Sequence, residues 1–239
     1  MVLGVDGCRQ GWVAAIIEEH RPIRLERFDD LSSLWAQYGH PCRLMLVDIP
    51  IGLIAEGAEG RECDRHARRL LSPLRHSSIF TPPCRSALYA GDPSEINFQL
   101  TGKKLSRQTI NILPKIRETD LWLRSLPQWE RAIIKESHPE LVFATLNGGR
   151  PLLNNKKKAS GRTERIDLLQ RYLPEAAAIL AEARSHIPAK AAQPDDLTDA
   201  LVLALAAKRA AERPELARSL PDDPSLDKEG LPMQIFYSA

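Results

Sequence analysis

Three apolar runs separated by short turns open the chain, and this pattern constrains the fold more than any other part of the sequence. The runs cover residues 1–6, 12–19 and 23–28, and a turn bounded by glycines at 7–11 joins the first two. Short apolar or alternating runs between turn residues are typical of β-strands, and short connections favour antiparallel pairing. The sequence therefore predicts an antiparallel meander of three strands.

A short helix capped by Asp29-Asp30 and a fourth strand are predicted next. The strand covers the apolar run 43–48, and Pro50 ends it because proline cannot continue a central strand. We therefore expect the fourth strand to stop near Asp48.

Most of the remaining chain has a helical pattern. Residues 51–130 are predicted to form a helical insertion, and a fifth strand is predicted over 131–136. The other expected segments are a basic helix near 61–71, an amphipathic helix at 106–126 kinked by Pro114, a mobile Gly- and Lys-rich loop at 147–161, helices at 165–172, 174–185 and 194–211, and an edge strand at 233–237. The fold class is α/β: a five-stranded mixed sheet flanked by helices, with the insertion between strands four and five.

The composition is that of a globular protein: of 239 residues, 43% are hydrophobic and 27% are charged. The length suits a single domain over residues 1–239. Asp6, Asp48 and Asp199 interrupt the best apolar runs, so no membrane span is predicted. The N-terminus has no basic segment before an apolar stretch, and the four cysteines form no C-x-x-C pair. We therefore expect no secretory signal, reduced thiols and a cytoplasmic location.

The net charge of +2 conceals an uneven distribution of charged residues. Residues 61–165 hold 20 Lys and Arg against 10 Asp and Glu, so the middle of the chain is basic and the two ends are acidic. A basic middle suits a polyanion, and acidic ends suit a metal ion. The alternative is that the basic clusters are solvated helix faces and a mobile loop.

Asp6 and Asp48 end the first and fourth predicted strands. In open α/β sheets, ligands gather beyond the carboxyl ends of strands, and two acids there would face each other. Adjacent carboxylates repel and raise each other's pKa, so such a pair is usually stabilised by a cation or a shared proton. A divalent metal is the natural partner. The alternative is that each is only an aspartate at a strand end.

A third group of acids opens the strongly apolar helix at 194–211. Asp196 and Asp199 are three residues apart and share a face of its first turn. Asp195 is a plausible N-cap, and acids in the first turn are favoured by the helix dipole, so capping is the alternative role for all three. Because the rest of the helix is apolar enough to be buried, its acidic turn would be held near the sheet.

Several motifs make the sequence resemble a known family. They are G-V-D-G-C-R at 4–9, D-I-P-I-G at 48–52, R-x-C-D-R-x-A-R-R at 61–69, H-P-E at 138–140 and L-N-G-G-R-P at 146–151. With the late D-x-x-D-A-L, their order resembles the ribonuclease H-like superfamily, which includes the Holliday-junction resolvases, and more closely domain-of-unknown-function family 429. Members of that family are described as predicted nucleases of ribonuclease H-like fold. Gln10 stands where we expect another glycine, a departure that affects no catalytic residue.

The resemblance implies a two-metal role for Asp6, Asp48 and Asp196 or Asp199. Two Mg²⁺ or Mn²⁺ ions bridged by Asp6 would activate water and stabilise the departing oxygen of a phosphodiester. All-oxygen ligands favour these ions over zinc.

Most further candidate site residues directly follow the fifth predicted strand or lie in the basic segment 61–165. Glu136 is placed to lie beside the metal, and His138 to assist proton transfer near neutral pH. The residues expected to bind substrate phosphates are Arg9, Arg61, Arg65, Arg68, Arg69, Lys156 and Lys157. For the arginines of 61–69, the alternative is a surface helix neutralised by its own acids, and Asp64 could pair with one guanidinium.

The sequence thus predicts a metal-dependent nuclease that acts on DNA or RNA, without a membrane partner. Two alternatives remain. One is a binding or scaffolding protein of the same fold without turnover. The other is a nucleotide-dependent phosphotransferase of the actin and sugar-kinase superfamily, whose first strand also ends in G-x-D-G but which needs a second, duplicated domain.

Overall fold

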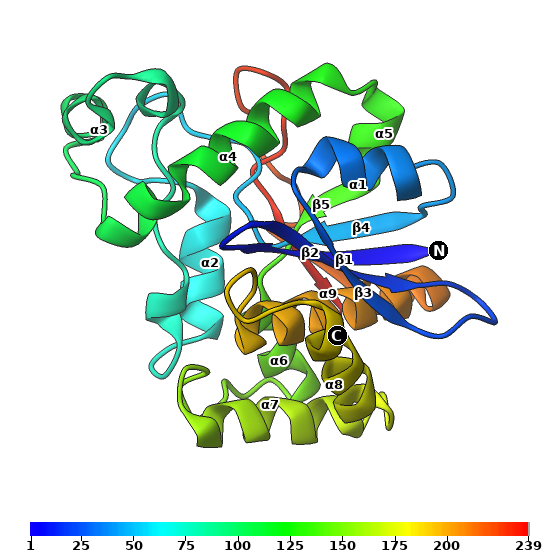
Figure 1. The fold of residues 1–239 in the computed structure, drawn as a ribbon. Coiled ribbons are helices and arrows are strands. Elements are labelled where there is room, and N and C mark those ends of the chain that lie inside the picture. The colour runs from blue at the N-terminus through cyan, green and yellow to red at the C-terminus, as the bar shows by residue number, and fades with distance from the viewer. Residues whose placement is uncertain (239) are drawn as a thin grey trace.

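A computed structural model of the protein describes residues 1–238, and a five-stranded sheet lies at its centre (Figure 1). The strands are β1 (Val2–Cys8), β2 (Gly11–Ile17), β3 (Arg24–Phe28), β4 (Leu44–Val47) and β5 (Ile134–Glu136). Their spatial order is β3-β2-β1-β4-β5. β1 pairs antiparallel with β2 and parallel with β4, and β4 pairs parallel with β5. The predicted meander and five-stranded mixed sheet are confirmed, and the architecture is ribonuclease H-like.

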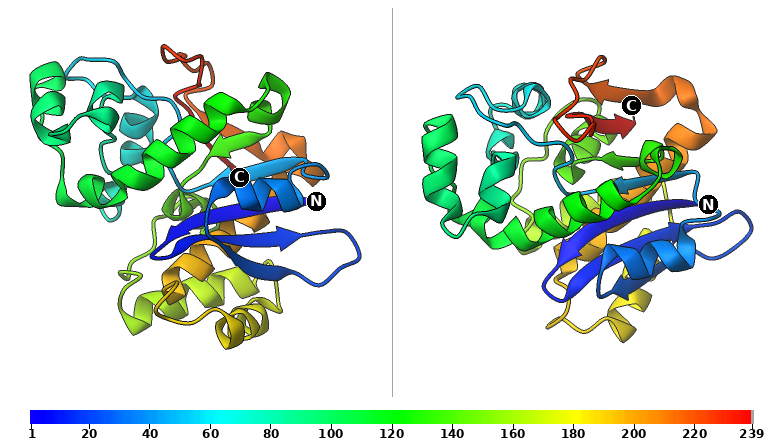
Figure 2. Two further views of the ribbon diagram at one scale, coloured as in Figure 1. Left: turned by 45° about the horizontal axis from the view of Figure 1, so that its top comes forward. Right: turned by 90° about the horizontal axis from the view of Figure 1, so that it is seen from above.

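Helices cover both faces of the sheet (Figures 1 and 2). The helices are α1 (Leu31–Tyr38), α2 (Glu62–Leu70), α3 (Pro93–Thr101), α4 (Arg107–Ser125), α5 (Gln128–Ala132), α6 (Pro139–Leu146), α7 (Ala159–Gln170), α8 (Ala176–His186) and α9 (Pro194–Glu212). α1 and α4 lie over one face, and α9 lies against the other with α6, α7 and α8 beyond it. α2 and α3 stand beyond the end of the sheet at which β1 finishes.

Side-chain alternation along the strands sorts the core into two layers. Val2 and Leu46 pack in the cluster on the α9 side, whereas Leu3 and Val5 pack in the cluster on the α1 and α4 side. Because successive strand residues point to opposite faces, even-numbered positions of both β1 and β4 face α9.

Gly4 lets α9 lie directly on β1. A Cβ atom added at Gly4 would lie 2.0 Å from the backbone nitrogen of Ala204 and 2.3 Å from the carbonyl oxygen of Ala200. No side chain fits between the strand and the helix at this position. The contact fixes the distance of α9 from the even-numbered face of β1.

We expect Gly4→Ala to destabilise the protein by about 3 kcal/mol, because the helix backbone must move to admit the methyl group. Thermal unfolding followed by circular dichroism measures the effect. Gly91→Ala is the matched control, since a Cβ there meets nothing within 4 Å and φ is not in the left-handed region. Equal melting temperatures for the two variants would contradict the close contact.

Several predicted boundaries were wrong. β5 begins at Ile134 and not at 131, because the preceding residues form α5. β1 continues two residues past Asp6. The predicted edge strand at 233–237 is β7 (Ile235–Ser238), and it pairs with β6 (Ala217–Leu220) in a separate two-stranded sheet. α3 was not predicted.

The segment expected to be a mobile loop is shorter than predicted and is held by hydrogen bonds. α7 begins at Ala159, and its Glu164 carboxylate accepts hydrogen bonds from the backbone of Leu153 (3.0 Å) and Asn154 (2.8 Å). Loop and helix therefore form one packed unit.

Within residues 1–238, the structure contains no helix with the length and apolar character needed to cross a membrane.

Candidate metal centre

Three aspartates from three elements meet on the α9 side of the sheet. Asp6 occupies an even position of β1, and Asp48 directly follows β4 in the same phase as Leu46. The backbone nitrogen of Asp48 donates to the carbonyl oxygen of Val5 (2.9 Å), which sets the two aspartates side by side. Asp199 reaches them from the N-terminal part of α9, and one carboxylate oxygen of each residue lies within 4.8 Å of the others.

The burial of this cluster leaves a carboxylate oxygen without a partner. Asp199 is 1% exposed and Asp6 is 7% exposed. The Oδ1 atom of Asp199 is buried without a hydrogen-bond donor. Since an unsatisfied buried acceptor is costly, the orphaned oxygen and its neighbouring carboxylates form a group that could hold a divalent cation. Oxygen ligands alone suit Mg²⁺ or Mn²⁺.

Burial and mutual repulsion raise the pKa values of the clustered aspartates. Burial raises the pKa of Asp6 well above its usual range, and the nearby carboxylates of Asp48 and Asp199 raise it further. Burial also raises the pKa of Asp48. The pKa of Asp199 is raised by burial to about 6, although a neighbouring lysine opposes the shift.

That lysine is Lys156, from the loop before α7. Its Nζ atom lies 2.5 Å from Oδ2 of Asp199 and 3.8 Å from a carboxylate oxygen of Asp195. Burial alone would lower the pKa of Lys156, but the attraction of Asp199 and Asp6 outweighs it and the pKa is raised. The ammonium group is therefore charged and partly neutralises the cluster.

The raised pKa of Asp199 predicts how stability depends on pH when metal is removed. A carboxyl with a folded-state pKa of about 6 and an ordinary value of 3.8 holds its proton more tightly when folded. Its contribution to stability is therefore present at low pH and is lost as the pH rises through about 6, by roughly 3 kcal/mol at most. We expect the melting temperature of the chelated protein to fall between pH 5 and pH 8.

The matched measurement uses Asp199→Asn, which should reduce this pH dependence, while Asp6 and Asp48, whose pKa values are also raised, keep the remainder. Mn²⁺ should raise the melting temperature of the wild-type protein more at pH 8 than at pH 5, because bound metal replaces the protons. A wild-type protein whose pH dependence equals that of Asp199→Asn would contradict the role of this carboxyl.

The other two acids at the start of α9 have different surroundings. Asp196 accepts a hydrogen bond from the backbone of Gln193 (2.7 Å) and forms a capping box with it. Asp195 is half-buried and faces Lys156 at 3.8 Å. The N-cap is Gln193 and not Asp195. Asp199, and not Asp196, is the α9 residue in the group of three.

The centre opens into a cleft of about 690 Å³ between α4, α6 and the loop before α7. His138 lines this cleft, and its Nε2 atom lies 3.2 Å from the carbonyl oxygen of Ser78. A carbonyl only accepts, so Nε2 donates there and Nδ1 holds the lone pair. Nδ1 is buried without a partner.

Glu140 is a fourth acid at the cleft that the sequence did not single out as a site residue. It is 5% exposed in the first turn of α6, and its Oε1 atom accepts a hydrogen bond from Arg165. Its Oε2 atom is buried without a partner. The H-P-E motif was the available signal, but a glutamate after Pro139 is equally typical of a helix start.

Glu136 is not one of the three clustered carboxylates, and it is held by Arg61. The two side chains form two parallel contacts of 2.7 Å each, and Arg61 also pairs with Asp64 at 2.6 Å. Arg61 is 3% exposed, so its guanidinium faces the interior. The predicted pairing of Asp64 with an arginine is confirmed, and Arg61 has no free donor to offer a phosphate.

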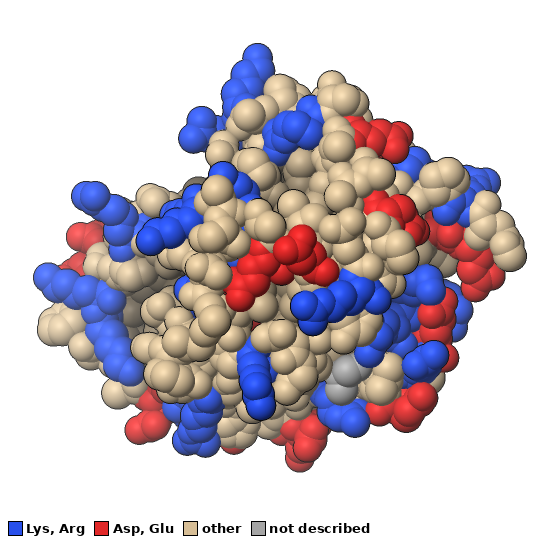
Figure 3. All heavy atoms as spheres, turned by 90° about the horizontal axis from the view of Figure 1, so that it is seen from below, with Lys and Arg blue, Asp and Glu red and all other residues tan. Residues whose placement is uncertain are grey.

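The remaining expected phosphate ligands lie in different places. Arg65 and Arg68 are half-buried and donate to backbone oxygens near Gly60 and at Ile79. Arg9 is exposed in the β1–β2 turn and Arg69 is exposed on α2, whereas Lys157 lines the cleft beside Lys156. Figure 3 shows that charges of both signs are interspersed on the underside of the molecule, so that face is not a uniform basic surface.

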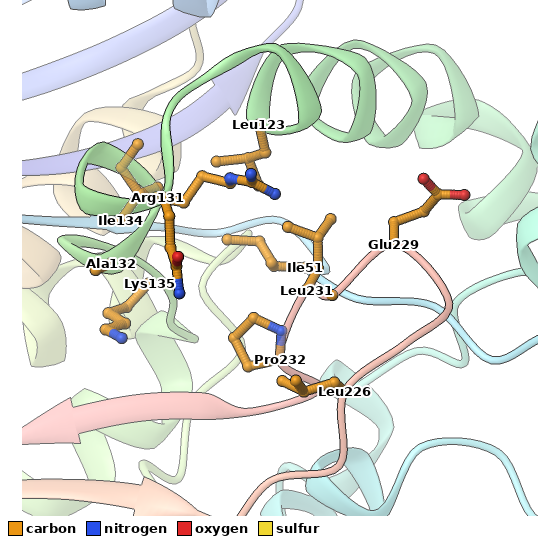
Figure 4. A pocket seen from close by; sticks show the side chains of 12 residues that line it. Ile51, Leu123, Arg131, Ala132, Ile134, Lys135, Leu226, Glu229, Leu231 and Pro232 are labelled. Atoms are coloured by element: carbon orange, nitrogen blue, oxygen red, sulfur yellow. The ribbon is translucent and has the colours of Figure 1, made fainter.

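A second cavity, of about 430 Å³, lies between α5, β5 and the segment before β7 (Figure 4). Its walls are mainly apolar, and Ile51, Leu123 and Leu231 point into it. None of the three clustered aspartates lines this cavity. The clustered carboxylates therefore belong to the polar cleft and not to this apolar cavity.

Comparison with known proteins gives a family match. The family described as Protein of unknown function (DUF429) matches residues 4–226, a range that includes the three aspartates and Lys156. No curated protein and no solved structure matches the chain.

Proposed function

The chain belongs to the DUF429 family, and from the geometry of its carboxylate centre we propose that it is a metal-dependent nuclease that hydrolyses phosphodiester bonds of nucleic acid. One observation carries the proposal. The carboxylates of Asp6, Asp48 and Asp199 converge within 4.8 Å at the end of a cleft, Asp6 and Asp199 are buried, and an oxygen of Asp199 lacks any hydrogen-bond partner.

The three aspartates would hold Mg²⁺ or Mn²⁺. When bound, such an ion supplies the charge that polarises a phosphodiester and lowers the pKa of water. Asp6 is on the strand that contacts both of the other elements, since β1 pairs with β4 and packs against α9. The rigid placement of the carboxylates on a strand, a strand end and a helix fixes the position of the ion.

Other residues of the cleft would handle the proton and the substrate. We assign His138 as the proton acceptor, because the Nδ1 atom of its neutral ring has no hydrogen-bond partner and the residue lines the same cleft as Asp48. Arg107 and Lys157 are exposed on the cleft wall, where their charges suit the phosphates on either side of the scissile bond.

The size of the basic surface favours a polymer over a small phosphodiester. A second hollow of about 330 Å³ continues from the cleft and shares Ser77, Phe80 and Gln108 with it. Lys103 and Lys104 line this extension. A strand that runs along both hollows would meet basic side chains at several phosphates, so binding should weaken steeply with salt.

The experiment is cleavage of labelled single-stranded, duplex and branched DNA and RNA at low salt with Mg²⁺ or Mn²⁺. We expect the wild-type protein to cut at least one of these substrates, and chelator or Asp199→Asn to abolish the cutting. Asp167→Asn is the matched control, because Asp167 is exposed on α7 and is not one of the three clustered carboxylates.

Two results would overturn the proposal. Tight binding of nucleic acid without cleavage under any of these conditions would favour a binding protein of the same fold. Specific ATP binding without nucleic-acid cleavage would favour the phosphotransferase alternative.

A further inference from the structure

We infer that the ammonium group of Lys156 takes the place of one of two metal ions, so that the centre binds a single divalent ion and Lys156 contacts a non-bridging oxygen of the scissile phosphate. The inference rests on the proposed nuclease function and names the group that stabilises the phosphate. It replaces the two-ion arrangement that the family resemblance implies.

The two oxygens of Asp199 are already divided between two roles. Oδ2 is engaged by Lys156 at 2.5 Å, whereas Oδ1 is buried and unpartnered. In a two-ion centre bridged by Asp6, Asp199 could serve both ions only by giving up its contact with Lys156, and otherwise the second ion would have only Asp6 and Asp48 of the three carboxylates as ligands. The geometry thus leaves one oxygen of Asp199 for an ion and reserves the other for the lysine.

The charge balance points the same way. With Asp6, Asp48 and Asp199 ionised and Lys156 protonated, these four groups carry a formal charge of −2, which one divalent ion neutralises; Asp195, which also faces Lys156, has a side chain that is 21% exposed and keeps access to solvent. A second ion would leave the buried centre at +2, and uncompensated buried charge is costly. Glu140 does not change this balance, since its charge is paired with that of Arg165.

The buried side chain of Arg165 fixes the backbone segment that carries Lys156. Arg165, which is 1% exposed, donates to the carbonyl oxygens of Asn154 (3.1 Å) and Gly161 (2.9 Å) and also pairs with Glu140. Arg165 therefore binds the backbone on both sides of Lys156 and links this segment to Glu140, which lines the cleft.

The backbone on either side of Lys156 is also closely packed. A Cβ atom added at Gly161 would lie 2.0 Å from the carbonyl oxygen of Asn155, so α7 packs directly against the loop. Asn155 also accepts a hydrogen bond from the backbone of Lys158 (2.9 Å). A lysine fixed in this way is a preorganised cation, which is the arrangement that stabilises charge developing in a transition state.

The chemistry of an ammonium group suits this role. It is a compact charge with three donors, of which one is engaged by Asp199, and lysine is a common ligand of phosphate oxygens. Lys156 lines the cleft and its side chain is 32% exposed, so a substrate can reach it.

The test is the stoichiometry and affinity of Mn²⁺ for the full chain without substrate, measured by electron paramagnetic resonance and calorimetry. We expect one ion per wild-type chain. Lys156→Met should bind Mn²⁺ at least about tenfold more tightly, because a cation that competes for the carboxylates is removed, and should cut nucleic acid at least about 100-fold more slowly. Lys156→Arg should keep one ion at near wild-type affinity.

Lys158→Met is the matched control, because Lys158 is exposed two residues away and its substitution should leave Mn²⁺ affinity unchanged. Two ions of similar affinity in the wild-type protein, or unchanged affinity and cleavage in Lys156→Met, would overturn the inference while leaving a nuclease in place. One tightly bound ion with no cleavage of any nucleic acid would instead overturn the proposed function.

Discussion

Replacing Asp6 with Asn should reduce nucleic-acid cleavage by more than about 100-fold while making the metal-free protein more stable. Loss of groups that merely orient metal ligands costs 10–100-fold, so loss of a ligand should cost more. The gain in stability follows because the amide removes a buried charge that Asp48 and Asp199 repel. We expect a higher melting temperature than that of the wild-type protein at pH 8 with chelator present.

The combination of lost activity and gained stability separates a metal ligand from a structural residue. Asp167→Asn is the matched control, because Asp167 is exposed on α7 and the same substitution there should change neither quantity. If Asp6→Asn cut nucleic acid at the wild-type rate, or if it lost activity only because it unfolded, the centre would not be metal-dependent as proposed.

Replacing Arg61 with Met should lower the free energy of unfolding by about 3–5 kcal/mol, the usual cost of breaking a buried ion pair from one side. Asp64 and Glu136 would both lose their partner, and the carbonyl oxygen of Ile51 would lose a donor at 3.0 Å. For a chain of this length the melting temperature should fall by roughly 10–15 °C.

Arg69→Met is the matched control on the same helix, since Arg69 is exposed and its loss should change the melting temperature by less than about 2 °C. The pair of variants also distinguishes a structural from a phosphate-binding Arg61. A stable Arg61→Met protein with weakened nucleic-acid binding would show that its guanidinium serves the substrate.

The sheet and the approach of Asp6 to Asp48 could be predicted because their signals are local. Each strand of the meander is bounded by turn residues, and Asp6 and Asp48 follow apolar runs whose ends meet in a parallel pair. The distinction between Asp196 and Asp199 was beyond the sequence, because both lie on one side of α9 and only its seating on Gly4 decides which carboxylate reaches the sheet.

The surroundings of the centre depend on contacts between distant residues, which is why the sequence left them open. Lys156 and Asp199 are 43 residues apart, and Glu140 and Arg165 are 25 apart. The helical spacing of the arginines in 61–69 indicated that they share a face of the helix, but not whether that face points to the interior or to solvent. Arg61 turned inward because Glu136 at the end of β5 offers it a buried carboxylate.

The pairing of β6 with β7 was missed for the same reason. Neither strand is long or strongly patterned, and their partnership spans the turn-rich segment 221–234. β5 was misjudged at its start, because Arg131 and Ala132 end the short helix α5, none of whose residues is buried, and Ile133 is its C-cap.

The most direct test of the carboxylate centre is a crystal structure of the wild-type protein grown with Mn²⁺, in which anomalous scattering locates the ion independently of activity. We predict one strong peak within about 2.5 Å of carboxylate oxygens from Asp6, Asp48 and Asp199, including Oδ1 of Asp199. A fully occupied Mn²⁺ site elsewhere, or no peak at these carboxylates when Mn²⁺ is saturating, would contradict the assignment of a metal centre here.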